Sequence, residues 1–91
     1  MNTYLISYDL NQPGQDYKSL IDAIKSYPNY CMALKSQWFV EASDEENSDT
    51  IFKHLSKHID ANDLLFVCQV IKNLHGRFSK DCCEWLKQRN L

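Results

Sequence analysis

The chain has 91 residues, a formal net charge of −2 and 44% hydrophobic residues. This length predicts a single domain, 1–91, that buries only about 60–65% of its unfolded surface, so an oligomer is a simple way to enlarge its core. The sequence contains no apolar run of about 18 residues, which a membrane-spanning helix needs, and its start does not resemble a signal peptide. We therefore expect a cytoplasmic protein without a membrane partner.

The positions of the four cysteines indicate structural residues rather than disulfide bonds. Cys31 and Cys68 lie in apolar stretches, Cys82 and Cys83 are adjacent, and the sequence has no Cys-x-x-Cys motif. In a cytoplasmic chain they are most simply small core residues, with Cys83 as a candidate exposed thiol.

The first segment, 3–10, predicts a central strand, because aromatic and aliphatic residues fall on both of its alternating faces. Asp9 stands at its end, and Pro13 and Gly14 predict a turn directly afterwards. A carboxylate at the end of a strand is held rigidly enough for metal binding or catalysis. The alternative is that Asp9 stands there only because aspartate favours turns.

A first helix is predicted after this turn, with Asp16 as N-cap and an end before Pro28. Its apolar stripe consists of Tyr17, Leu20, Ile21 and Ile24. Two short strands, about 30–34 and 37–42, follow, although one continuous strand fits the pattern nearly as well.

A second helix is predicted to begin with Ser48 or Asp49 as its cap. Its apolar stripe consists of Ile51, Phe52, Leu55 and Ile59. The segment 64–71 is the most apolar run of the chain and predicts a buried strand. A last helix is predicted near Ser79, with Phe78, Cys82, Trp85 and Leu86 as its packing residues.

The predicted order β-α-β-β-α-β plus one helix indicates the α+β class, with a ferredoxin-like antiparallel sheet and an additional C-terminal helix. In that arrangement the first strand lies between the third and fourth. The polar positions Asp9, Ser36 and Asp63 are therefore expected to meet at one end of the sheet. The second sheet face needs a cover, which the last helix, a second subunit or both can supply.

This convergence predicts a magnesium site. Asp9 and Asp63 supply carboxylates, and Ser36 and Asn62 are polar neighbours. Mg²⁺ needs only one or two protein carboxylates when water and phosphate oxygens complete its coordination, and such an ion can activate a water for phosphodiester cleavage. The alternative is that Asp63 and Asn62 only end a helix and start a strand.

The histidines offer a weaker signal. His54 and His58 are one helical turn apart, a spacing that can place two imidazoles on one zinc ion. A solvated pair beside the apolar stripe is the simpler interpretation. His75 is a candidate base or phosphate contact in a loop.

Charges are distributed unevenly along the chain. Acidic residues dominate 41–63, and basic residues dominate from Lys72 onwards. The second segment predicts a locally basic face that could hold a phosphate backbone, and a solvated helix face is the alternative. The candidate nucleic-acid contacts are Arg77, Lys80, Lys87 and Arg89.

The segment 5–10, Leu-Ile-Ser-Tyr-Asp-Leu, resembles the first strand of the second CRISPR-associated (Cas) protein family and of its relatives, which include virulence-associated protein D and small uncharacterised Cas-like proteins. The resemblance implies a ferredoxin-like homodimer with Asp9 near its symmetry mate. It also implies magnesium-dependent cleavage of RNA, and sometimes of DNA, with Asp9 as the catalytic residue. Some members of the family bind nucleic acid as structural subunits without needing cleavage.

Two functions are therefore expected. The first is a metal-dependent endonuclease, by preference an endoribonuclease, of a toxin or anti-phage defence type. The second is a non-catalytic dimeric module that binds nucleic acid or a partner protein. A small-molecule sensor ranks third, because the sequence offers no ligand signature.

Overall fold

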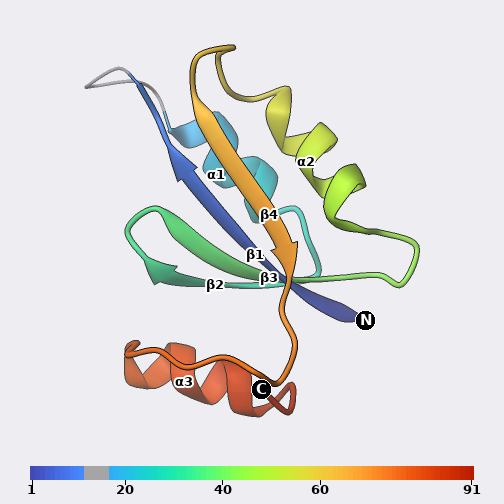
Figure 1. The fold of residues 1–91 in the computed structure, drawn as a ribbon, viewed down its shortest axis with the longest axis vertical. Helices are drawn as coiled ribbons and strands as arrows, with labels where there is room; N and C mark the ends of the chain where they lie inside the picture. Colours follow the sequence, from blue (N-terminus) through green and yellow to red (C-terminus); the bar gives the residue numbers. More distant parts are fainter. Residues whose placement is uncertain (12–16) are drawn as a thin grey trace.

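The computed structural model describes residues 1–11 and 17–91, and in this part it contains one four-stranded antiparallel sheet and three helices (Figure 1). The elements in chain order are β1 (Asn2–Asp9), α1 (Lys18–Ile24), β2 (Asn29–Leu34), β3 (Gln37–Ala42), α2 (Ser48–Ser56), β4 (Leu64–Gln69) and α3 (Lys80–Lys87). This confirms the α+β class. The predicted turn at Pro13 and Gly14 and the predicted cap Asp16 lie outside the described residues.

The strand order is β2-β3-β1-β4, so β1 lies between the third and fourth strands as predicted. Both neighbours run antiparallel to it, with Ser7 opposite Gln37 and Asp9 opposite Leu64. The segments 30–34 and 37–42 form two separate strands that pair with each other. The end of β1 therefore lies beside the beginnings of β3 and β4.

Helices α1 and α2 cover one face of the sheet, which we call the helical face. The buried cluster there contains Tyr4, Ile6 and Tyr8 of β1 together with Trp38, Val40, Leu20, Ile24, Ile51 and Leu55. The Trp38 Nε1–H donates a hydrogen bond to the Tyr8 hydroxyl at 3.3 Å, so the polar atoms of these two buried aromatic rings satisfy each other.

Helix α3 covers part of the opposite face. Phe39, Cys82 and Leu86 form a second buried cluster there, and the Phe39 ring stacks on that of Trp85 with centroids 6.3 Å apart. Ser79 caps α3 by accepting a hydrogen bond from the Cys82 N–H at 3.2 Å. This confirms the predicted start of the last helix near Ser79. Figure 1 shows α3 near the N-terminal end of β1, away from the end that carries Asp9.

Two details of the sequence interpretation were wrong. The cap of α2 is Asn47, not Ser48 or Asp49, because Asn47 and Thr50 form a reciprocal capping box. The segment 64–71 is not a buried strand. The strand that forms there, β4, ends at Gln69 and lies at the sheet edge, and Leu64 and Phe66 are 65% and 58% exposed.

The exposure of β4 has a physical cause. Leu64 lies opposite Asp9 and Phe66 lies opposite Ser7. The residues that alternate with them along β4, Leu65 and Val67, pack against the core on the helical face. Leu64 and Phe66 therefore lie on the face of α3, beyond the part that this helix covers. Hydropathy alone cannot distinguish such a strand from a central one.

Candidate functional site at the end of β1

Asp9 is the last residue of β1 and its side chain is exposed. The buried residues Tyr4, Ile6 and Tyr8 alternate with it along the strand and face the helices. Asp9 is therefore directed to the face that carries α3. The pairing of β1 with β3 ends at Ser7, but its pairing with β4 continues to Asp9, which lies opposite Leu64. The carboxylate is therefore presented to solvent from a residue that is still held in the sheet.

Asp63 lies close to Asp9 in the fold but serves a different purpose. It is buried, and its carboxylate accepts hydrogen bonds from the backbone N–H groups of Asn11 and Asp60, each at 2.8 Å. The first of these bonds joins the segment after β1 to the segment before β4. Asp63 thus connects these two segments and supplies the hydrogen-bond acceptor for the backbone N–H groups of Asn11 and Asp60.

Ser36 joins the same end of the sheet through its backbone. Its carbonyl accepts a hydrogen bond from the Tyr8 N–H at 3.1 Å, while its side chain is exposed. Asn62 is exposed in the turn before β4. The predicted meeting of Asp9, Ser36 and Asp63 at one sheet end is therefore confirmed for the backbone.

The side chains at this end do not form a preassembled cation cage within one chain. Among residues 1–11 and 17–91, no group of three or more histidine, cysteine, aspartate or glutamate side chains is arranged to hold a metal ion. A magnesium ion at Asp9 would therefore take most of its ligands from water, from a bound phosphate or from a second copy of the chain.

The predicted basic contacts separate into two kinds. Arg77, Lys80 and Lys87 are exposed on α3 and the loop before it. The side chain of Arg89 is only 13% exposed, and its Nε lies 3.2 Å from Oε2 of Glu41. Its guanidinium also stacks on the Trp85 ring at 3.7 Å from the ring centre. Arg89 thus joins α3 to the sheet.

An exposed apolar surface lies beside Asp9. We call it the open strip and define it by Ser7, Asp9, Leu64 and Phe66, which the strand pairing places together on the face of α3. Leu5 and Cys68 are the next pair along the same face, and together with Phe39 and Phe78 they are among the residues that line a cavity of about 300 Å³. The sequence indicated Asp9 as a site residue, whereas the apolar run 64–71 wrongly predicted that Leu64 and Phe66 are buried.

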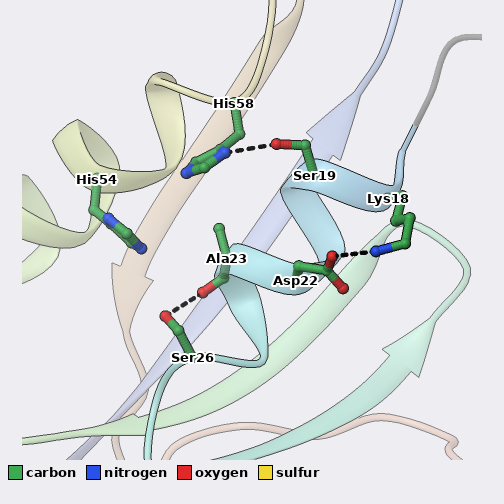
Figure 2. A pocket seen from close by; sticks show the side chains of 7 residues that line it. All are labelled: Lys18, Ser19, Asp22, Ala23, Ser26, His54 and His58. Carbon is green, nitrogen blue, oxygen red and sulfur yellow. Dashed lines mark hydrogen bonds and ion pairs between the residues drawn. The ribbon is translucent and has the colours of Figure 1, made fainter.

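A second pocket, of about 460 Å³, lies between α1 and α2 on the helical side of the molecule. Figure 2 shows His54 and His58 pointing into it from α2 and the turn that follows, with Ser19 of α1 opposite. The Ser19 Oγ lies 2.7 Å from Nδ1 of His58. The spacing of the two histidines was visible in the sequence, but a contact with Ser19, 39 residues earlier in the chain, was not.

No family model matches the chain, and neither a curated protein nor a solved structure matches it significantly. No helix in the described part of the chain is both long enough and apolar enough to cross a membrane.

Proposed function

We propose that the chain is a cytoplasmic homodimeric module of the ferredoxin-like type that binds nucleic acid. The observation that carries this proposal is the open strip, in which the large apolar side chains Leu64 and Phe66 are exposed beside Asp9 on one sheet face. The strand order β2-β3-β1-β4 with the β-α-β-β-α-β element order supports the ferredoxin-like assignment. The four free cysteines agree with a reducing compartment.

A second copy of the chain is the occupant that fits the open strip best. A domain of this size has a small core, and contiguous exposed apolar surface is unusual on a monomer. A two-fold contact uses the same surface on both copies. The strip suits such a contact because its apolar part is flanked by the polar Ser7, and its only charge, Asp9, stands at the end of the strand.

The dimer is tested by measuring the molar mass of the full chain with light scattering, over a range of concentrations. Phe66→Asp should shift the population towards the monomer, because burial of a charge at the interface is costly. Met32→Asp is the matched control, since Met32 is also an exposed apolar residue but lies on β2, at the other sheet edge. A monomeric wild type, or equal dissociation in both variants, would contradict the proposal.

Nucleic acid is favoured over a protein partner by the exposed basic residues Arg77, Lys80 and Lys87. Binding through these residues should weaken steeply with salt, because phosphate contacts release counterions. The test is fluorescence anisotropy with labelled RNA and DNA at several salt concentrations. Lys80→Glu together with Lys87→Glu should reduce the affinity at least tenfold. Unchanged affinity in this double variant, or no binding by wild type, would leave a protein partner as the better proposal.

A metal-dependent endonuclease is the second candidate, and one observation favours it. Asp9 is exposed on the same face as Leu64 and Phe66, so a dimer that buries the open strip brings two Asp9 carboxylates to one interface. Two carboxylates with water and phosphate oxygens are a sufficient ligand set for Mg²⁺. The resemblance of segment 5–10 to the second CRISPR-associated family supports the same chemistry.

The nuclease is tested by incubating labelled RNA and DNA with the protein and Mg²⁺. Wild type should cleave, and Asp9→Asn, which keeps the shape of the side chain but removes its charge, should not. Equal activity in both proteins, or no activity in either at high protein concentration, removes this candidate and leaves the binding module.

A further inference from the structure

We propose that His54 and His58 bind a divalent transition-metal ion, Zn²⁺ in the cell, in the pocket between α1 and α2. This site is on the helical side of the molecule, whereas Asp9 is directed to the face of α3. The proposal is therefore independent of the dimer and of any magnesium chemistry at Asp9.

The separation of the two imidazoles suits a shared ion. Their ring centres are 5.6 Å apart and the planes are inclined at 73°. A Zn–N bond of about 2.0–2.1 Å puts each ring centre roughly 3.2 Å from the metal, so two imidazoles on one tetrahedral ion have centres about 5.2 Å apart. The observed separation of the ring centres is therefore close to the one that a shared ion requires.

Contacts on both rings hold them in place. When the Nδ1–H of His58 donates to the Ser19 Oγ at 2.7 Å, its Nε2 keeps the lone pair that a metal needs. The ring of His54 packs against Tyr27 edge to face, at 5.8 Å and 87°. Figure 2 shows both rings directed into the space above Ala23, whose small side chain leaves room there.

The donor set also determines which metal is suitable. Imidazole nitrogen favours Zn²⁺, Ni²⁺ and Cu²⁺ over Mg²⁺. The nearest carboxylate in the pocket, Asp22, is paired with Lys18 at 2.7 Å. The described residues provide no group of three ligands, so water completes the coordination and leaves exchangeable positions on the ion.

The position of the site on α2 is favourable as well. His54 lies in the last turn of this helix, and His58 follows its end. A cation at a helix C-terminus is stabilised by the helix dipole. Because binding to the folded chain alone raises its stability, Zn²⁺ should raise the melting temperature of the protein.

The experiment is a calorimetric titration of the full, chelator-treated chain with ZnCl₂, and separately with MgCl₂. Wild type should bind one Zn²⁺ per chain and no Mg²⁺ at these two histidines. His54→Gln and His58→Gln should each lower the Zn²⁺ affinity at least tenfold, and Ser19→Ala should lower it several-fold because His58 loses its orienting contact. His75→Gln is the matched control and should leave the affinity unchanged.

Nuclear magnetic resonance of the imidazole groups supplies a second readout. Zn²⁺ should shift the signals of His54 and His58 and leave that of His75 in place. The proposal is overturned if wild type and both glutamine variants bind Zn²⁺ equally, or if millimolar ZnCl₂ shifts no histidine signal. It is also overturned if replacing the cysteines with serine abolishes binding, since the thiols would then be the ligands.

Discussion

Arg89 reaches back across 48 residues to Glu41, with its Nη2 3.5 Å from Oε1 and its Nε 3.2 Å from Oε2. A further hydrogen bond runs from its Nη1 to the carbonyl oxygen of Trp85 at 2.9 Å. This pair links the end of α3 to β3 and fixes the side of the sheet on which the helix packs.

Arg89→Met should lower the free energy of unfolding by about 1–3 kcal/mol, because it leaves the largely buried Glu41 carboxylate without its cation. Chemical denaturation measures this change. Lys87→Met is the control, since Lys87 is exposed two residues away, and its effect should stay within about 0.5 kcal/mol. Equal effects in the two variants would show that the Glu41 pair adds nothing to stability.

Asp63→Ala should lower the free energy of unfolding by about 1–3 kcal/mol, since the amides of Asn11 and Asp60 lose a charged acceptor. Asp60→Ala removes an exposed carboxylate from the same turn and is the matched control. A fall in stability for Asp63→Ala alone supports a structural role for this residue. No fall in either variant would contradict it.

Tyr27 should make stability depend on pH in the alkaline range. Burial raises the pKa of Tyr27 to about 12 from an ordinary 10.0, and the Glu46 carboxylate adds to the rise. Between these values the unfolded chain releases the proton while the folded chain keeps it. The contribution of Tyr27 to stability is thus complete below pH 10 and is lost as the pH rises towards 12.

Denaturation at a series of alkaline pH values tests this, with Tyr27→Phe as the comparison. The Tyr27 hydroxyl is buried and has no hydrogen-bond partner among the described residues. Its removal should therefore leave stability unchanged or raise it by up to about 1 kcal/mol at neutral pH. The variant should also lose stability less steeply than wild type above pH 10. Parallel pH profiles would contradict the assignment.

Cys82 should be the least reactive thiol of the chain. Burial raises the pKa of the Cys82 thiol to about 12, and contact with the Cys31 thiol adds to the rise. Relative to an ordinary thiol, its thiolate fraction at neutral pH is lower by roughly a thousandfold. Alkylation followed by mass spectrometry should modify the half-buried Cys31, Cys68 and Cys83 before the buried Cys82. Modification of Cys82 at the same rate as the other three thiols would contradict the protection that its burial should give.

Much of the fold followed from local patterns. The stripe Leu20 and Ile24, the alternation of Trp38 and Val40, and the cap Ser79 each determine their element within a few residues, and the structure confirms them. The convergence at the end of β1 was predicted from the ferredoxin-like strand arrangement that the element order suggested, and the strand pairing agrees with it.

The features that the sequence did not predict depend on contacts between distant segments. The exposure of Leu64 and Phe66 is set by where α3 packs, which their own hydropathy does not report. The structural role of Asp63 depends on hydrogen bonds from two backbone amides, and one of these, that of Asn11, is 52 residues away in the chain. The contact between Ser19 and His58 requires α1 and α2 to be adjacent on the same sheet face.

The two apolar clusters lie on opposite faces of the sheet, and only the cluster around Phe39, Cys82 and Leu86 needs α3. The helix can therefore detach in a sub-global opening while the strands remain paired beneath α1 and α2. Amide hydrogens of α3 should then exchange with solvent far sooner than those of β1. Such an opening would uncover Phe39 and lengthen the apolar surface that a second copy or a ligand meets, so the size of the binding face would vary with the position of one short helix.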